Sequence, residues 1–315
     1  MVVLYIILGI LGLFIILVTI GMIISYTHKN MFDNHYTPHF YNDYPDEETG
    51  NWLPVKKVHN YVYDDKFHYT YGKTFGEKLA IFGVRLLGFT VVPFLLLFDG
   101  AVIYRGQRKL NKYSKQFKNG FISVCNHVYK YEFLMIREMK PFTSCYVPIW
   151  QEGAEGPDGN FYRAGGGVVL PHTTPRSMFY GFKELDKLIK EGKWVHIFPE
   201  QAGWFYYGGV RKFQNGTFKL AYDNDKPIVP FGISFRKRRG LWRLFGPKNK
   251  PCVTLSVGDP IFPNKENEKN AEVERLTNEA RSAVMNLANI RDEEQNNEIK
   301  STYNYYKYDA SKSSF

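Results

Sequence analysis

Cysteine is scarce in this sequence. Its 315 residues include three cysteines, Cys125, Cys145 and Cys252, and they contain no C-x-x-C pair. Such spacing encodes neither a disulfide framework nor a zinc site. We therefore expect a protein that binds no metal and works in a reducing compartment.

Charged side chains are absent from residues 1–27. About 20 apolar residues are enough for a helix to cross a bilayer, so this segment predicts a transmembrane helix. A cleaved signal peptide is the alternative. It is disfavoured because the segment has no basic start, its apolar run is too long, and no small-residue cleavage site follows.

Acidic side chains are absent from residues 104–118 and 226–258, in a chain with a net charge of +10 and a pI near 9.2. The first stretch holds six cations and should face the cytoplasm by the positive-inside rule. In the second, cations alternate with Trp242, Leu244 and Phe245, which is typical of contact with an anionic membrane surface; a solvated loop is the alternative. Nucleic-acid binding is disfavoured, because the cations flank apolar segments.

Two segments separate the N-terminal helix from the rest of the chain. Residues 28–78 are polar and have no sustained period, which predicts an irregular, solvent-facing connection. Residues 79–98 are apolar with a single charged residue, Arg85, and Pro93 should kink or end a helix there. The second segment predicts a membrane-associated element, with a buried core helix as the alternative.

Residues 99–290 alternate between short apolar runs and helical patterns. This predicts an α/β domain with a mixed, largely parallel sheet flanked by helices. We expect Pro230 to break one strand, a helix to run from a cap at Ser177 to Gly192, a helix within 267–290, and a disordered polar tail over 291–315. The predicted strands are FISVCN, SCYVPIW, GGVVLP, WVHIFP, PIVPFGISF and CVTLSVG.

His127 follows the first of these runs, and Glu132 comes five residues later. Strand ends are where α/β folds expose reactive groups. A carboxylate on one ring nitrogen would fix the imidazole tautomer and leave the other nitrogen to take a proton from a hydroxyl. Because no G-x-S-x-G elbow occurs, that hydroxyl would belong to the substrate. Taken alone, the pair is also compatible with a structural histidine.

Three further motifs follow in order: G-G-x-x-x-P at 166–171, F-P-E at 198–200 and IVPFGI at 228–233. Together with N-H-x4-acid at 126–132, they resemble the lysophospholipid/glycerolipid acyltransferase family, best known for 1-acylglycerol-3-phosphate acyltransferases. The resemblance covers residues 104–260, about half of the chain.

The match departs from the family pattern at four positions. Glu132 stands where aspartate is usual, Gln201 replaces the glycine of F-P-E-G, and Gly203 replaces an arginine. His172 lies near the place of a second arginine. In the family these arginines are associated with the acceptor's phosphate, so the departures affect the acceptor more than the chemistry.

Cations elsewhere near the motifs are candidates for the missing phosphate ligands. They are Arg163, Arg176, Arg211 and Lys212, and a guanidinium suits phosphate oxygens well. Most such side chains are ordinary surface cations. Of the four, we expect Arg176 and Arg211 to bind the phosphate.

The resemblance implies an O-acyltransferase of phospholipid synthesis, at the cytoplasmic face of a membrane. Its donor would be acyl-CoA or acyl carrier protein, with no bound cofactor, and its acceptor a lysolipid, expected to be 1-acylglycerol-3-phosphate. His127 would be the base and Glu132 its orienting partner, while Glu200, Pro199 and Phe198 would bind substrate. Two alternatives stay open: a non-phosphate acceptor such as a glycolipid, and a catalytically degenerate membrane scaffold.

Overall fold

The computed structural model of the chain describes residues 58–245 and 250–298, with isolated positions at 5, 9, 12, 13 and 16. The predicted transmembrane helix at 1–27 therefore lies almost wholly outside the described residues. So do the first part of the polar connection and the end of the tail.

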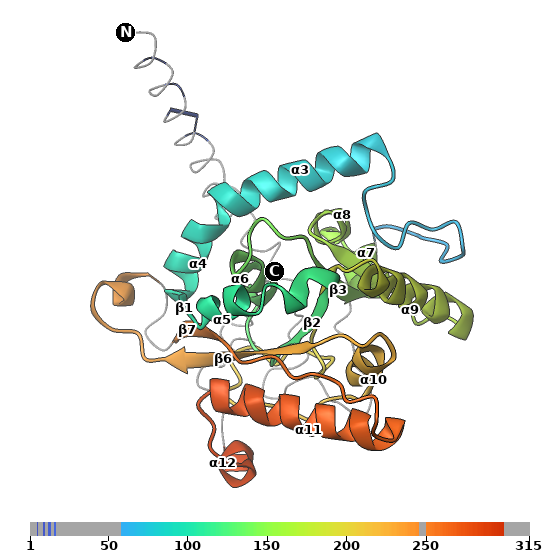
Figure 1. Cartoon of the computed structure of the whole chain (residues 1–315). Coiled ribbons are helices and arrows are strands. Elements are labelled where there is room, and N and C mark those ends of the chain that lie inside the picture. Colours follow the sequence, from blue (N-terminus) through green and yellow to red (C-terminus); the bar gives the residue numbers. More distant parts are fainter. Residues whose placement is uncertain are drawn as a thin grey trace.

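The fold is built on seven strands: β1 (Ile103–Arg105), β2 (Phe121–Val124), β3 (Cys145–Trp150), β4 (Gly167–Leu170), β5 (Trp194–Ile197), β6 (Ile228–Arg236) and β7 (Cys252–Val257). They form one sheet in the order β1-β7-β6-β2-β5-β3-β4 (Figure 1). Strands β2 to β6 run parallel, whereas β7 pairs antiparallel with β6 and parallel with β1. The predicted mixed, largely parallel sheet is confirmed.

The six predicted strands are all present, and β1 was not foreseen because it is only three residues long. The predicted break at Pro230 is wrong, since β6 continues through this residue. Pro230 lies where the pairing of β6 changes from one neighbouring strand to the other. The pairing with β2 ends at Pro230, and the pairing with β7 begins at Phe231. The carbonyl of Pro230 accepts a hydrogen bond from the Gly258 N–H (2.8 Å), a bond that proline can still make.

Helices cover both faces of the sheet (Figure 1). Leu96, Leu110 and Met135, from α4, α5 and α6, are buried against one face, and Leu185 and Leu276, from α9 and α11, against the other. Both faces are thus apolar and covered, as parallel sheets require. The helices are α3 (Phe75–Thr90), α4 (Val92–Gly100), α5 (Gln107–Lys112), α6 (Glu132–Glu138), α7 (Gln151–Glu155), α8 (Gly159–Ala164), α9 (Pro175–Lys190), α10 (Gly216–Asp223), α11 (Lys269–Leu287) and α12 (Glu293–Glu298).

Two helix boundaries differ from the prediction. α9 begins earlier, because Thr174 is its N-cap, and Ser177 completes a capping box from the third helical position. The tail predicted to be disordered from residue 291 begins with α12. The side chain of Asn296 in α12 exchanges two hydrogen bonds with the backbone of Val210, each 2.8 Å long, and this ties the helix to the domain.

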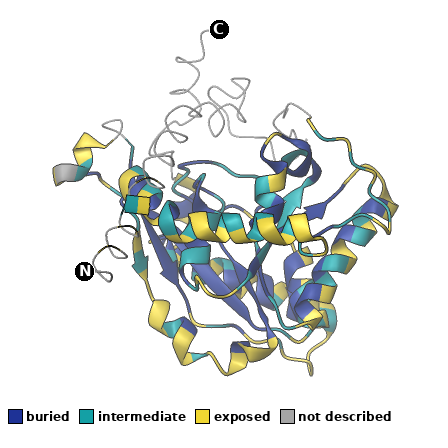
Figure 2. Cartoon of the chain, turned by 90° about the horizontal axis from the view of Figure 1, so that it is seen from above, coloured by how far each residue is buried: buried dark blue, intermediate teal, exposed yellow. Residues whose placement is uncertain are grey.

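The apolar segment at 79–98 forms α3 and α4. Among the described residues, no single helix is long and apolar enough to cross a membrane, but these two pass that test together, with a bend of 47°. Pro93 lies in the first turn of α4, at the predicted break. α3 buries none of its residues, and Figure 2 shows it in teal and yellow. α3 is therefore not a buried core helix.

The described part of the polar connection is irregular over residues 58–74, its last four residues, 75–78, belong to α3, and it does not face solvent throughout. Tyr69 is 5% exposed, and its carbonyl accepts a hydrogen bond from the backbone of β4. The guanidinium of Arg163 lies over the rings of Tyr61, Phe67 and Tyr71, at 5.1, 4.8 and 4.4 Å from their centroids. Arg163, which is 5% exposed, anchors this segment and is not available to a substrate phosphate.

Candidate active site

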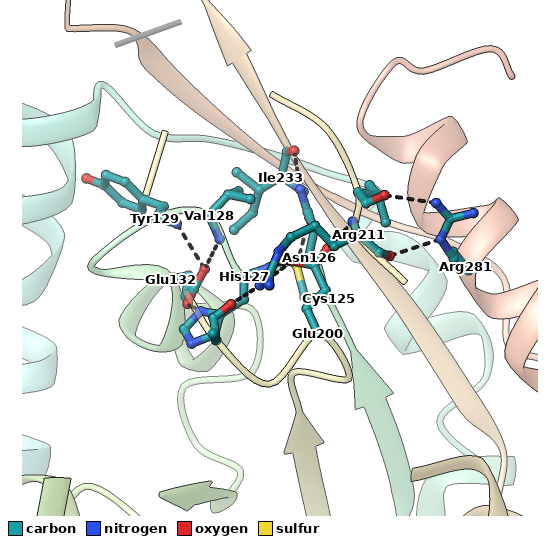
Figure 3. Close-up of polar contacts among 12 residues, drawn as sticks. Cys125, Asn126, His127, Val128, Tyr129, Glu132, Glu200, Arg211, Ile233 and Arg281 are labelled. Carbon is teal, nitrogen blue, oxygen red and sulfur yellow. Dashed lines mark hydrogen bonds and ion pairs between the residues drawn. The ribbon is translucent and has the colours of Figure 1, made fainter. Parts of the chain in front are cut away.

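His127 and Glu132 meet at the carboxyl edge of the parallel strands. His127 follows β2, Glu132 is the first residue of α6, and Nδ1 of the histidine is in contact with Oε1 of the glutamate (Figure 3). The other carboxylate oxygen accepts hydrogen bonds from the N–H groups of Val128 and Tyr129 (2.9 and 3.0 Å). The longer glutamate therefore still reaches the imidazole, and it also fixes the loop that carries it.

The imidazole of His127 is packed between aromatic rings and a glycine. Phe198 stacks on it with a centroid distance of 4.4 Å, and Phe205 meets it edge-on at 6.5 Å. A Cβ atom at Gly203 would lie 3.1 Å from Cε1 and 3.2 Å from Nε2 of His127. The position at which the resembled family has arginine is thus in contact with the imidazole, and only glycine leaves Nε2 uncrowded.

Glu200 supports the same loop from inside the protein. Its side chain is fully buried, and it accepts hydrogen bonds from the N–H groups of His127 (3.2 Å) and Arg211 (3.0 Å). The Arg211 guanidinium pairs with it at 3.1 Å. Burial raises the pKa of the Glu200 carboxyl, and the charge of Arg211 opposes that rise. Oε2 of Glu200 is used by His127 and the Arg211 guanidinium, and Oε1 by the backbone of Arg211. Glu200 does not line the cavity described below, and its predicted role in binding the acceptor stays a prediction.

Asn126 ties the end of β2 to its neighbour. Its side-chain N–H donates to the carbonyl of Ile233 (3.0 Å), and its side-chain oxygen accepts from the N–H of Ile233 (2.8 Å) (Figure 3). The amide side chain thus imitates a further residue of the β2–β6 ladder just beyond the point where the backbone pairing stops. This holds the backbone rigid next to His127.

The segment after Glu200 forms the other wall of the site. The N–H groups of Trp204 and Tyr206 donate to the carbonyls of His127 (2.9 Å) and Val128 (2.6 Å). Gln201, which replaces the glycine of the family motif, has a φ of +65°. That is the left-handed region, where glycine is favoured and other residues are strained.

A cavity of about 770 Å³ opens beside His127. Its lining includes Phe133 from the α6 side of the sheet and Leu185 from the α9 side, so it reaches around the strand ends to both faces. Phe198 and Pro199, which were predicted to bind substrate, also line it. Ligand sites typically have this mostly apolar lining and volume.

The predicted phosphate ligands do not meet in this cavity. Arg176 is exposed in the first turn of α9, where its Nε donates to the hydroxyl of Tyr180 (3.3 Å). Arg211 is 6% exposed, pairs with Glu200, and lies 4.5 Å from the ring centroid of Trp204. Neither lines the cavity. The choice of Arg176 and Arg211 is therefore corrected: one is a surface cation, and the other is structural.

Other features of the site were missed by the sequence patterns. His172, near the place of the second family arginine, has its Nε2 2.6 Å from Oε1 of Glu152, and this glutamate lines the cavity. Arg137 of α6 also lines it. No local motif marks these residues, since they come from separate elements. In the part of the chain that the structure describes, no group of three or more His, Cys, Asp or Glu side chains could hold a metal ion.

Comparison with known proteins gives a family match that includes this site. Residues 101–234, which include His127, Glu132 and Glu200, match the family model described as Acyltransferase. No curated protein matches the chain. A solved structure that it resembles is the 1-acyl-sn-glycerophosphate (LPA) acyltransferase PlsC from Thermotoga maritima, with 20% identity, a TM-score of 0.43, and coverage of 65% of this chain and 80% of that one. The family match and the order of the motifs agree over residues 101–234, so this part of the chain is similar to the acyltransferase family.

Proposed function

We propose that this protein is a membrane-bound O-acyltransferase that moves an acyl chain from a thioester to the free hydroxyl of a lysolipid in phospholipid synthesis. The donor is acyl-CoA or acyl carrier protein, and the first-choice acceptor is 1-acylglycerol-3-phosphate. The observation that carries the proposal is the contact of His127 Nδ1 with Glu132, at the edge of an apolar cavity. It leaves Nε2 as the nitrogen that can act on a substrate.

The proposed reaction needs a base, an attacking hydroxyl and a leaving thiol. Nε2 of His127 takes the proton of the acceptor hydroxyl while the hydroxyl oxygen forms a bond to the carbonyl carbon of the thioester. The carbon–sulfur bond then breaks, and the proton passes from the imidazolium to the departing sulfur. Glu132 stabilises the imidazolium, and general-base assistance of this kind typically contributes about 10²–10⁴-fold in rate.

The backbone amides nearest to His127 are not available for the oxyanion of this reaction. The N–H of His127 donates to Glu200, and those of Val128 and Tyr129 donate to Glu132. These three amides hold the catalytic loop in shape. Groups other than these must stabilise the tetrahedral oxyanion.

We further propose that α3 lies against the cytoplasmic face of a membrane. Phe75, Leu79 and Phe82 are 83%, 60% and 65% exposed, at helical spacing along one side of α3. Phe142 is 91% exposed, and its ring lies 5.4 Å from that of Phe89 at the end of α3. An exposed apolar stripe of this extent is typical of an interaction surface, and the predicted helix at 1–27 would hold it at a bilayer.

The membrane proposal is tested by sedimentation with vesicles of anionic phospholipid. A chain lacking residues 1–27 should still bind them, and Phe142→Asp should reduce the bound fraction. The matched control is Phe179→Asp, since Phe179 is 61% exposed on α9, away from α3, and should have no effect. A truncated chain that stays wholly in solution at low salt would contradict the proposal.

The enzymatic proposal is tested by incubating the full chain with labelled acyl-CoA or acyl carrier protein and a panel of lysolipids. Label should pass to a lysolipid with the intact protein and not with the His127→Ala variant. Transfer to uncharged acceptors but not to phosphate-bearing ones would favour the second candidate, a non-phosphate acceptor. That candidate is supported by the carboxylate of Glu152 in the cavity wall. Absence of transfer from both donors to every lysolipid would contradict the proposed function.

A further inference from the structure

One cation in the cavity wall stands out by its surroundings. Arg137 lines the cavity on the same side of α6 as Phe133, and its guanidinium lies 5.8 Å from the ring centroid of Phe133. A Cβ atom at Gly165 would be 3.8 Å from its Nη1. Among the described residues, none forms an ion pair with this guanidinium. Arg137 thus presents a positive charge without an ion-pair partner among the described residues to a mostly apolar space.

The surroundings of Arg137 do not favour this charge. Burial lowers the pKa of Arg137, and the charge of Arg85 acts in the same direction, while Cys145 and Glu138 partly oppose this shift. The neighbouring acid, Glu138, does not line the cavity, and burial raises the pKa of its carboxyl. Arg137 is half-buried, and removing a charge even partly from water is costly when it has no partner. A ligand that brings a negative charge would supply the missing partner.

A second arginine, which does not itself line the cavity, acts on the charge of Arg137. Arg85 of α3 donates from Nη2 to the hydroxyl of Ser144 (2.6 Å), just before β3 begins. Its neighbour Val84 lines the cavity, so the cavity extends as far as α3. The two arginines repel each other in the absence of an anion. They also place this positive end of the cavity beside the exposed apolar stripe of α3, where a lipid would approach.

The other charged groups in the cavity wall are less suited to bind an anion. Lys130 has its ammonium 4.8 Å from the ring centroid of Tyr131 and makes further interactions of its own. Glu152 is negative and in contact with His172. Of the two cations that line the cavity, Lys130 and Arg137, the arginine also has the planar fork that suits phosphate oxygens.

We propose that Arg137 binds the phosphate of the lysolipid acceptor, with Arg85 adding to the positive potential at that end of the cavity. This inference rests on the proposed function, because it places the acceptor hydroxyl at His127. Arg137 follows Glu132 by five residues of helix, a rise of roughly 7.5 Å. In 1-acylglycerol-3-phosphate only C2, C3 and the ester oxygen separate the hydroxyl oxygen from phosphorus. His127 and Arg137 both line the one cavity.

The test measures binding in the full chain with the His127→Ala substitution and without an acyl donor, so that no transfer occurs. The probes are 1-acylglycerol-3-phosphate, 1-acylglycerol and inorganic phosphate. Arg137→Gln should weaken binding of the phosphate lipid by about ten- to a hundredfold, as expected for loss of a charge-assisted hydrogen bond, and leave the uncharged lipid unaffected. The matched control, Arg176→Gln, should change neither. Inorganic phosphate should bind far more weakly than the phosphate lipid.

The inference would be overturned if Arg137→Gln left the affinity for the phosphate lipid unchanged, or lowered the affinity for both lipids equally. It would also be overturned if Arg176→Gln lowered the affinity for the phosphate lipid as much, or if inorganic phosphate bound as tightly as the lipid. If the glutamine variant does not fold, Arg137→Lys keeps the charge without the fork, and should show a smaller loss confined to the phosphate lipid. The binding test does not depend on turnover. If Arg137→Gln weakens binding of the phosphate lipid only, but the unmodified protein transfers no acyl group, the proposed function fails and this inference stands. Transfer without such discrimination would defeat only this inference.

Discussion

Two histidines from neighbouring strands contact the ring of Phe198, and they have opposite surroundings. His196 lies inside β5, fully buried, with Nδ1 2.7 Å from the hydroxyl of Ser123, which also accepts a hydrogen bond from the indole of Trp194. Burial lowers the pKa of His196 to about 3. His127 lies just after β2, its Nδ1 is in contact with a carboxylate, and its side chain is 24% exposed.

The comparison shows what separates a reactive histidine from a structural one in this fold. His196 has a neutral hydroxyl as its partner and meets Phe198 edge-on at 4.5 Å inside the core, so it stays uncharged. His127 has Glu132 to stabilise its protonated form and a cavity to admit a substrate. The two histidines have similar positions in the sheet, but they differ in their hydrogen-bonding or ionic partner and in their access to the cavity.

The largest expected effect is on His127. His127→Ala should lower the turnover number for acyl transfer by about 10²–10⁴-fold, because general-base assistance is lost. Folding, followed by circular dichroism, should be unchanged, since the ring lies at a cavity. His59→Ala, at a histidine stacked on Tyr61 far along the chain, is the matched control and should keep its activity. Retention of more than about a tenth of turnover would remove His127 from the mechanism.

The partner of His127 is the next point to test. Glu132→Gln should lower turnover at least about tenfold more than Glu132→Asp, because an amide cannot stabilise the imidazolium and can hold the wrong tautomer. Aspartate keeps the charge, and it is the residue usual in the family motif. The measurement is turnover as a function of pH for both variants. Equal rates for Glu132→Gln and the unmodified protein would show that no charged partner is needed.

Crowding the imidazole should give a smaller loss. In Gly203→Ala the new methyl group would meet Cε1 and Nε2 of His127 at 3.1 and 3.2 Å, so the ring must shift. We expect turnover to fall about tenfold, equivalent to about 1.4 kcal/mol, with little change in the Michaelis constant. Gly153→Ala is the control, because Gly153 also lines the cavity but has no atom within 4 Å of a new Cβ. Similar losses in both variants would point to the cavity and not to the imidazole.

His196 should affect stability and not chemistry. Its pKa is about 3 in the folded protein against an ordinary value of 6.5. Between these values the unfolded chain binds a proton that the folded chain does not, so stability should fall as pH falls from about 6.5 toward 3. In His196→Gln this part of the pH dependence should be missing when the free energy of unfolding is measured by denaturant titration. An unchanged slope would show that His196 is not the group responsible.

The smallest expected effect is at Gln201. A residue other than glycine at its φ of +65° carries local strain, on the order of 1–2 kcal/mol in the left-handed region. Gln201→Gly should relieve this strain, although the greater freedom of glycine in the unfolded chain offsets part of the effect. The free energy of unfolding should rise by about 0.5–1 kcal/mol. The measurement is the midpoint of thermal unfolding, which should rise by a few degrees. A lower midpoint would mean that the glutamine side chain makes contacts worth more than the strain.

Much of the fold was predictable, because it depends on patterns between residues that are close in the sequence. Apolar runs of four to nine residues marked every strand except the three-residue β1. The break between α3 and α4 followed from Pro93, whose ring is tolerated only in the first turn of a helix. Pro230 misled the prediction, since whether a proline disturbs a strand depends on which bonds its neighbours use.

The pairing of charges was not predictable in the same way. Arg211 was expected to bind phosphate, but it is buried against Glu200. Arg137 had no motif around it, although it lines the cavity. Whether a cation is free for a ligand depends on which carboxylate the fold brings to it, and that partner can be any distance away in the sequence.

By itself, the sequence determined the α/β class, the strand ends and the short link from His127 to Glu132. The connection between β2 and α6 is only residues 125–131, and so short a connection keeps these two side chains near each other. The tertiary structure alone decided how long-range contacts are distributed. It brought Glu200 behind His127, Gly203 against its imidazole, and Arg137 into the cavity wall. The physical reason is that burial and charge compensation depend on all surrounding elements at once, whereas sequence periodicity reports only which side of one element faces the core.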